Sequence, residues 1–383
     1  MRHARVLTLL LALLVSPFPA ALAQSGTTGE PESARFDQLA RSFFEWRRVQ
    51  QPVSGDDIPR VERPDGWVPD WSPEAIEGYR AAYREYIRVL ERLDVEEWSV
   101  PRQVDARLLR AAMHRVPWEL DLLRAPHRNP LFYVQQTLGS VFELLLLSSP
   151  IDERRAENII LRFEQIPVTL KHARENLTEP VRPFAEATIE VLDGVDERLE
   201  QVETALDAHI PDELKRRFHS SVSRASRSLE RYQKWLRSDL DEMRVSFAIG
   251  PDAYTWFLGN VALIPYTPNE LLAQGRQDWN RSVAWDVLEQ NRNRQQSELP
   301  LFRNMEQQIT VSDMKEKEIR AFLEAQDLMT VPDWLQHYRS RPMPDYLAPI
   351  AFLGVNDDLT SETRLDEDAY RYITEPSPDL PYF

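Results

Sequence analysis

The hydrophobic pattern around which the chain is organised lies between residues 157 and 206, where apolar residues recur at steps of three and four. Charged residues fill most positions between them, as in an amphipathic helix. Pro180 interrupts the pattern, so the sequence predicts two long helices joined at a short corner. Two helices cannot bury such stripes alone, and we expect further helices around them. The apolar positions are Ile159, Phe163, Ile166, Leu170, Ala173 and Leu177, then Phe184, Thr188, Val191, Val195, Leu199, Val202 and Leu206.

Similar periodicity predicts helices along most of the remaining chain. Ser72-Pro73 and Thr267-Pro268 each combine a capping hydroxyl with a proline in the first turn, which is typical of a helix start. Strict apolar–polar alternation occurs nowhere, and only residues 348–355 are considered as a strand. The predicted fold class is therefore all-α, a multi-helix elongated body with little or no sheet. The further helical segments are 36–46, 76–93, 104–116, 130–147, 213–243, 254–263, 268–288, 312–328 and 331–338.

Residues 51–72 form a long connection that is rich in proline and contains Trp67 and Trp71. This composition is too apolar for a free linker. We expect the connection to wrap over the helical body with both tryptophans docked.

The first residues predict export. Arg2 and Arg5 precede an apolar run at residues 6–15, and the small-residue sequence Ala21-Leu22-Ala23 follows. A positive start, an apolar segment of about 7–15 residues and an A-x-A site describe a secretory signal peptide, with cleavage after Ala23. The run is shorter than the roughly 18 residues that a membrane span needs, although an uncleaved anchor is the alternative. We expect a periplasmic or extracellular protein without a membrane span.

The predicted organisation is a signal peptide at residues 1–23, a flexible leader at 24–35 and a helical domain at 36–383. The leader is small and polar, whereas the domain is long enough to bury a large core. No cysteine occurs, so stability must come from packing instead of disulfides. The lack of cysteine also excludes a cysteine-linked lipid anchor, a thiol nucleophile and a cysteine-ligated metal site.

The chain is acidic, with 62 Asp and Glu residues against 46 Lys and Arg and a formal net charge of −16. Loss of the two arginines of the signal peptide takes the net charge to −18. A surface of this sign repels phosphate backbones, so nucleic acid is not an expected partner. Solubility in an exported protein is a sufficient explanation of the charge.

Local motifs exclude several common chemistries. The eleven glycines form no phosphate-binding loop, and Gly139-Ser140 lies in a helical pattern instead of a nucleophile elbow. No two histidines are three or four residues apart, so H-E-x-x-H is absent. His172 with Glu175, and His209 with Asp212, could each offer two metal ligands on one helix face, but we interpret them as surface or corner histidines. The histidines after the signal peptide are His114, His127, His172, His209, His219 and His337.

Carboxylates and tryptophans leave a sugar-related function open. A catalytic acid pair, as in a glycosidase, cannot be selected among 62 acidic residues. The ten tryptophans would suit sugar stacking, although at helical spacing they are more typical of a core or a domain seam.

Four short motifs occur in order within residues 35–300. They are Asn129-Pro130-x-x-Tyr133, Arg162-Phe163-x-x-Ile166-Pro167-x-x-Leu170-x-x-Ala173-x-x-Asn176-Leu177, Phe247-Ala248-x-Gly250-x-x-x-Tyr254 and Thr267-x-x-Glu270-Leu271-x-x-x-Gly275. Together they resemble a large family of exported bacterial proteins, the domain of unknown function number eight-eight-five. The resemblance implies a mostly helical, zincin-like body that is distantly similar to zinc carboxypeptidases, and metal-dependent cleavage of peptides.

The chain departs from that family at its carboxyl end. The family's metal motif resembles His-Glu-x-x-Pro-Gly-His and would follow the segment similar to Leu380-Pro381-Tyr382-Phe383, where this sequence stops. We therefore expect no catalytic residue and no metal ligand in this chain, and zinc only in a longer protein. There, zinc would polarise the scissile carbonyl and activate a water whose proton a glutamate accepts.

The resulting hypothesis is that the chain is the amino-terminal helical portion of an exported zinc-dependent peptidase-like hydrolase and is inactive alone. Its helices, such as 157–177 and 213–243, would line a channel for a peptide substrate. One alternative is a non-catalytic helical scaffold or binding module that ends at Phe383. Another is an α-helical glycan-processing enzyme.

Overall fold

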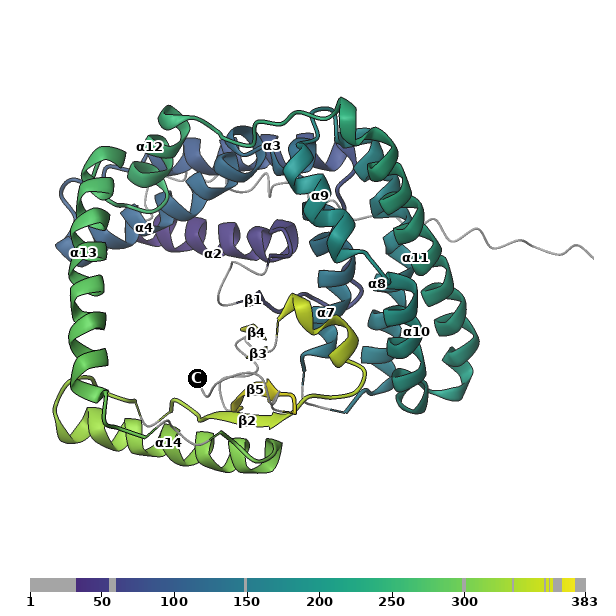
Figure 1. Ribbon diagram of the computed structural model, residues 1–383. Coiled ribbons are helices and arrows are strands. Elements are labelled where there is room, and N and C mark those ends of the chain that lie inside the picture. The colour runs from purple at the N-terminus through teal and green to yellow at the C-terminus, as the bar shows by residue number, and fades with distance from the viewer. Residues whose placement is uncertain are drawn as a thin grey trace, which may run out of the picture.

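Figure 1 presents the computed structural model of the 383-residue chain. The structure describes residues 32–54, 60–147, 150–297, 301–332, 334–354, 356–357, 359–360 and 367–375. Helices dominate these residues, which confirms the predicted all-α class. The signal peptide predicted at 1–23, most of the predicted leader and the last residues, 376–383, lie outside the described part.

Most helices follow one another with short connections. None of the described helices combines the length and the apolar composition that crossing a membrane requires. The α-helices are α2 (Glu32–Gln50), α3 (Pro73–Glu91), α4 (Val100–Pro117), α5 (Ala125–Arg128), α6 (Pro130–Val134), α7 (Ser140–Leu145), α8 (Glu153–Asn176), α9 (Arg182–Val191), α10 (Val195–Leu206), α11 (Asp212–Asp239), α12 (Pro251–Asn260), α13 (Pro268–Asn293) and α14 (Met305–Ala325). The wider π-helical turns are η1 (Trp118–Leu122) and η2 (Gln135–Gly139), and the 3₁₀ turns are η3 (Asp207–His209), η4 (Leu240–Glu242) and η5 (Ala348–Leu353).

Short strands join distant parts of the chain. Strand β1 (Arg60–Val61) pairs in parallel with β4 (Leu359–Thr360). Strand β5 (Ala369–Ile373) lies between β2 (Tyr338–Pro342), to which it is parallel, and β3 (Asn356–Asp357), to which it is antiparallel. These strands tie the carboxyl-terminal segment to the helical body without forming a sheet-based core.

Helices α8 and α11 form the central seam of the core. Phe163 of α8 and Phe218 of α11 are fully buried, with ring centroids 6.1 Å apart and planes at 70°. Such an edge-to-face arrangement is favourable for aromatic rings. The buried positions include Ile159, Phe163, Ile166, Leu170 and Ala173 on α8, and Phe218, Val222, Ala225, Leu229 and Leu236 on α11. The apolar stripes predicted for both helices are confirmed.

The corner at Pro180 is confirmed, but the prediction of one continuous helix over residues 184–206 is wrong. Helix α9 ends at Val191 and α10 begins at Val195. Between them Gly194 has φ of 65°, in the left-handed region that glycine adopts at little cost and that ends a right-handed helix. The turn allows both Leu192 and Val195 to be buried.

Two predictions near the carboxyl end are also wrong. The described residues of this range, 331–332 and 334–338, form no helix, and Tyr338 begins β2, because its backbone pairs with β5, about thirty residues later in the sequence. Residues 348–355 do not begin as a strand. They begin with the 3₁₀ turn η5, in which Ile350 and Leu353, three residues apart, are both buried. A 3₁₀ turn places residues three apart on one side, so this spacing suits burial against the helices.

The predicted docking of the connection 51–72 is confirmed. Trp71 is buried, packs edge-to-face on Phe132 at 4.7 Å and donates its indole N–H to Gln136 Oε1 over 3.0 Å. Trp67 donates to the Val49 carbonyl over 2.8 Å. Each tryptophan thus buries apolar surface while its polar atom finds a partner.

A buried polar network joins three segments: the connection, helix α6 and the end of α8. The Asn176 side-chain amide donates to the Trp71 carbonyl over 2.7 Å and to the Tyr133 hydroxyl over 3.0 Å. Tyr133 in turn donates to the Pro126 carbonyl over 2.8 Å. Burial raises the pKa of Tyr133, so the phenol remains neutral and able to donate.

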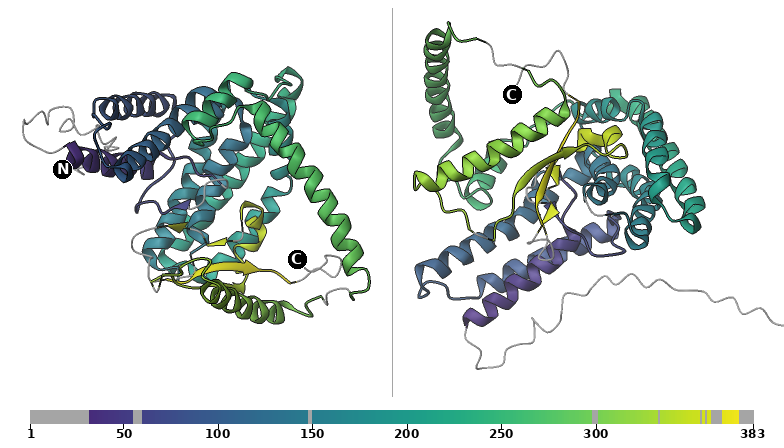
Figure 2. Two further views of the ribbon diagram at one scale, coloured as in Figure 1. Left: turned by 90° about the vertical axis from the view of Figure 1, so that its left-hand side faces the viewer. Right: turned by 90° about the horizontal axis from the view of Figure 1, so that it is seen from below.

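Helices α12, α13 and α14 make up a second, more open part of the molecule. Helix α13 runs from α12 toward α14 along the side opposite α8, α10 and α11 (Figures 1 and 2). The start of α13 is capped as predicted: Thr267 Oγ1 accepts from the Glu270 N–H over 3.3 Å, and the Glu270 carboxylate accepts from the Thr267 N–H over 2.7 Å. Neither α13 nor α14 contains a buried residue.

The seam predicts the effect of a core truncation. Phe163→Ala removes a buried ring from the α8–α11 contact and is expected to lower the free energy of unfolding by about 3–5 kcal/mol. Val168→Ala is the matched control, because Val168 lies on the same helix and is 42% exposed; its effect should stay below about 0.5 kcal/mol. Urea denaturation followed by circular dichroism measures both. Equal effects would contradict the assignment of α8 and α11 as the central seam.

Candidate functional site

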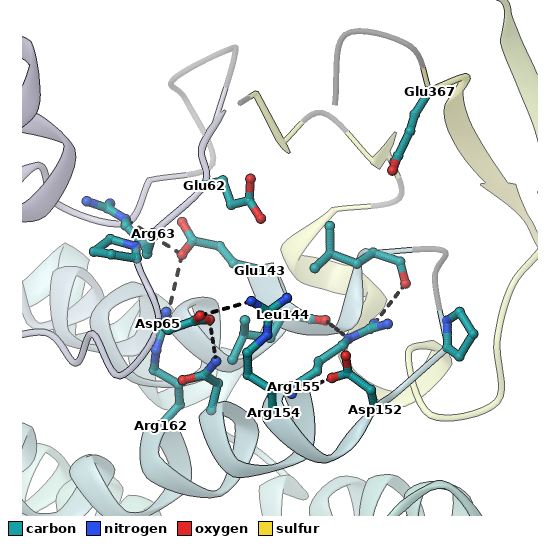
Figure 3. A pocket seen from close by; sticks show the side chains of 14 residues that line it. Glu62, Arg63, Asp65, Glu143, Leu144, Asp152, Arg154, Arg155, Arg162 and Glu367 are labelled. Carbon is teal, nitrogen blue, oxygen red and sulfur yellow. Dashed lines mark hydrogen bonds and ion pairs between the residues drawn. The ribbon is translucent and has the colours of Figure 1, made fainter. Parts of the chain in front are cut away.

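A polar cavity of about 230 Å³ lies where the connection 60–72 crosses α7 and α8 (Figure 3). Charged residues from these three segments line it, together with Glu367, which precedes β5. Small-molecule sites usually measure about 300–1,000 Å³. The cavity therefore suits a small polar group better than a large ligand.

Glu143 of α7 is the carboxylate at the centre of this cluster, and its side chain is only 5% exposed. Its Oε2 atom lies 3.9 Å from Arg63 Nε and 3.8 Å from Arg162 Nη1. Figure 3 shows the carboxylate directed toward both guanidinium groups. These separations are too long for direct hydrogen bonds but short enough for strong attraction in a buried site.

The two arginines are positioned by backbone carbonyls. Arg63 donates to the carbonyls of Arg48 and Gln51, each over 2.7 Å. Arg162 donates from Nε to the Trp67 carbonyl over 2.7 Å and from Nη1 to the Ser140 carbonyl over 2.9 Å.

Both guanidinium groups also lie over the Trp67 ring, at 4.6 Å for Arg63 and 4.3 Å for Arg162 from its centroid. Cations in this position are attracted by the ring face. The arginines therefore hold the connection against α7 and α8.

Arg155 adds a third buried cation to the cluster. Its Nε donates to the Leu144 carbonyl over 2.9 Å and its Nη2 to the Leu147 carbonyl over 2.8 Å, both at the end of α7. A cation at this end of a helix satisfies carbonyls that have no partner within the helix. Arg155 and Arg162 are seven residues apart on α8, so helical periodicity places them on the same face.

Burial makes these cations costly to hold. Desolvation lowers the pKa of Arg63, Arg155 and Arg162, that of Arg162 to about 9, while Glu143 opposes the shift for Arg63 and Arg162. Arg162 remains charged at neutral pH. The pKa of Arg162 in the folded protein lies below its ordinary value. Its charge therefore destabilises the folded state at neutral pH, and this destabilisation diminishes only as the pH rises above about 9.

Two buried guanidinium groups, those of Arg63 and Arg162, thus face one buried carboxylate, and Arg155 also lines the cavity. In addition, Arg63 Nε has no hydrogen-bond partner among the described residues. At the rim of the cavity the charges are exposed, and the carboxylate makes direct hydrogen bonds. Asp65 accepts from Arg154 over 3.1 Å and from the Asn158 amide over 3.0 Å. Chemically, the floor of the cavity can accept a carboxylate, a phosphate or a carbonyl oxygen.

The two His–acid pairs considered as metal ligands each have other neighbours in the part of the chain that the structure describes. His172 Nδ1 is buried without a partner, and Glu175 pairs with Lys171 at 3.5 Å. His209 packs edge-on against Tyr346, and Asp212 pairs with Lys215 at 3.1 Å. No group of three or more His, Asp or Glu residues that could hold a metal ion occurs among the described residues.

Sequence reasoning missed the Glu143 cluster. One signal could have found it, because Glu143 is the only charged residue between Asn129 and Ile151. A single acid in an otherwise apolar helical segment is seldom buried unless it has a partner. The identity of those partners, Arg63 and Arg162, has no local signal, since they lie 80 and 19 residues away.

A second missed contact lies between α10 and α11. His219 Nδ1 is 2.5 Å from Glu203 Oε1, and its Nε2 is 3.0 Å from Asp207 Oδ1. Glu203 and Asp207 are four residues apart, which places both carboxylates on one face. The histidine joins them only because α11 packs beside α10. The contact is partly exposed, and it links α10 to α11.

Comparisons with known proteins agree with the all-α fold. Residues 53–325 match a family described as "Bacterial protein of unknown function (DUF885)". Among solved structures, a candidate lipoprotein of unknown function from Shewanella oneidensis is similar, with a TM-score of 0.60 and 15% sequence identity. That match covers 90% of this chain but 65% of the other, so the chain spans about two thirds of that protein's length. No curated protein matches the sequence.

The cluster predicts the effect of neutralising its carboxylate. Glu143→Gln keeps the shape but leaves the buried guanidinium groups of Arg63 and Arg162 without their counter-charge, so the free energy of unfolding should fall by about 3–5 kcal/mol. Asp65→Asn is the control at the rim, where the side chains of Asp65 and Arg154 are 60% and 74% exposed; the expected loss is at most about 1 kcal/mol. Urea denaturation at pH 7 compares them, and a loss for Glu143→Gln no larger than the control's would contradict the assigned role.

Proposed function

Because the chain belongs to the DUF885 family of bacterial proteins, we propose that it is the amino-terminal helical portion of an exported zinc-dependent peptidase-like hydrolase. The observation that carries the proposal is the length of the solved relative. The match includes 90% of this chain but only 65% of the relative. The proposal requires a longer protein in which a further segment of substantial length follows this helical part.

No set of three or more metal-binding side chains occurs among the described residues. The proposal therefore assigns the metal and the general base to another part of the longer protein. No catalytic step is assigned to this chain. Its proposed contribution is to bind and orient a peptide.

The Glu143 cavity is the proposed place of contact with such a peptide. Its floor can accept a carboxylate or a backbone carbonyl oxygen, because two buried guanidinium groups face a single carboxylate and Arg155 adds a third positive charge to the lining. Helix α8 supplies Arg155, Asn158 and Arg162 to the cavity, whereas α11 supplies none of its lining. The proposed wall of the substrate site is thus α8 with the connection 60–72, and α11 supports α8 from behind.

A non-catalytic binding module is the second candidate. The exposed apolar side chains of α13 and α14 favour it, because surfaces of this kind commonly contact other proteins. A glycan-processing enzyme has less support from the described tryptophans of the connection: Trp71 is buried and Trp67 lies against two arginines, so neither presents a free ring to a sugar.

Zinc content and peptide cleavage test the proposal. The protein read from the gene beyond Phe383 is expected to bind one zinc ion per chain and to cleave an unstructured peptide. The 383-residue chain should do neither. Elemental analysis by mass spectrometry and peptide mapping measure both properties. A longer protein that binds no zinc and cleaves no peptide would exclude the peptidase function and favour the binding module.

Export is tested separately by amino-terminal sequencing. We expect the mature protein to be periplasmic or extracellular and to begin at Gln24. Ala23→Arg should block cleavage, because the processing site requires a small residue at this position. Gln24→Asn, which leaves the A-x-A site intact, is the control. Recovery of the unaltered protein with Met1 still attached and in the cytoplasm would contradict export.

A further inference from the structure

Helix α13 carries an apolar stripe that no described residue covers. Its side chains are 47–71% exposed, although they share one face of the helix. We call this face the α13 stripe; it consists of Leu272, Trp279, Val283 and Val287. Their spacing of seven, four and four residues is that of a buried helical face.

The opposite side of α13 has the features of a solvent-facing surface. Arg281 pairs with Asp278 at 2.7 Å, and Arg292 pairs with Glu289 through a short contact. Such pairs three or four residues apart support a helix by only about 0.2–0.5 kcal/mol each. This helix of 26 residues thus has ion pairs on one side and the stripe on the other, and two further exposed apolar residues, Trp285 and Leu288, lie away from the stripe.

Helix α13 also has little support from its neighbours. It contains no buried residue, and it stands apart from α8 and α11 in Figure 1 and in the right-hand view of Figure 2. Isolated helices are marginal in water and owe most of their stability to burial of an apolar face. Helix α14 has exposed apolar side chains of its own: it packs on β2, while Ile319 and Phe322, three residues apart, are each 57% exposed.

Exposed apolar side chains are most numerous in one part of the chain, although α2 and α4 also have some, such as Phe44 and Leu108. The α8–α11 seam is closed, and Val168 is the only large apolar side chain from Glu153 to Asp239 that is exposed. From Val245 to Tyr338, in contrast, exposed apolar side chains occur in every helix and in the connections. A monomer rarely exposes so many together unless a partner covers them.

We propose that the α13 stripe, with Ile319 and Phe322 of α14, is the docking surface for a further segment of the same polypeptide in a longer form of this protein. The solved relative with the same fold supports this occupant, because about a third of that chain has no counterpart here. A segment on the same polypeptide is also held at high effective concentration, so an apolar surface of modest width is sufficient. The expected occupant is an amphipathic helix that packs its apolar side on the stripe.

The inference rests on the part of the proposed function that makes this chain a portion of a longer protein, but not on zinc or on catalysis. If α13 is covered while the longer protein neither binds zinc nor cleaves peptides, the docking surface stands and the peptidase function fails. If the longer protein is active while α13 remains exposed, the docking surface fails and the function stands.

Hydrogen exchange of α13 tests the proposal. The protein read from the gene beyond Phe383 is compared with the 383-residue chain. Amides between Leu272 and Val287 are expected to exchange at least about 100-fold more slowly in the longer protein, because burial of the stripe stabilises the helix against local opening. In the longer protein, Trp279→Glu should return α13 to fast exchange. Gln277→Glu adds the same charge on the opposite, exposed side and should leave the protection intact.

Three outcomes would overturn the proposal. The gene could end at the codon for Phe383. The exchange of α13 could be equal in the two proteins. Finally, the 383-residue chain could form a dimer whose α13 amides are protected and which Trp279→Glu dissociates, as judged by light scattering. In that last case the occupant is a second copy of the chain.

Discussion

The packing of α8 against α11 is the interaction on which the rest of the structure depends. Their apolar faces meet at Phe163 and Phe218, and both rings are fully buried. Because the chain has no cysteine, no disulfide can replace this contact. The other buried helices, α6, α7, α9 and α10, pack onto one or the other of these two helices. Their positions therefore follow from the seam.

The Glu143 cluster joins the amino-terminal connection to that seam. Arg162 lies next to Phe163 in the sequence, so its side chain projects about 100° further around the helix than the buried ring. It reaches the Trp67 carbonyl and the neighbourhood of Glu143. A buried ion pair of this kind adds little net stability, since desolvation offsets most of the attraction. Its value lies in geometry: Arg63 and Arg162 hold Trp67 in one place and leave a polar cavity beside it.

The two parts of the molecule differ in how completely they bury apolar surface. In the part built on α8 and α11, the apolar faces of the helices are buried against each other. The part built on α13 and α14 has helices with capping and ion pairs but no buried residue. Local signals are sufficient to begin a helix, as the Thr267–Glu270 capping box does. They do not cover its apolar face, which requires other chain segments.

Much of the fold could be predicted from the sequence because a helix is a local structure. The stripes of α8 and α11, the caps at Ser72 and Thr267 and the docking of Trp71 all have signals within a few residues. The break at Gly194 was missed because a glycine between two stretches of equal periodicity is compatible with one helix or two. The strands were missed because β2 pairs with residues about thirty positions later in the chain.

The sequence by itself determined the all-α class, the central pair of helices and the lack of thiol chemistry. Only the tertiary structure decided that Glu143 faces Arg63 and Arg162, that His219 joins Glu203 and Asp207, and that α13 carries an uncovered stripe. Periodicity states which side of a helix is apolar, but it does not state what lies against that side. Contacts between distant segments depend on packing of the whole chain, and that information is not local.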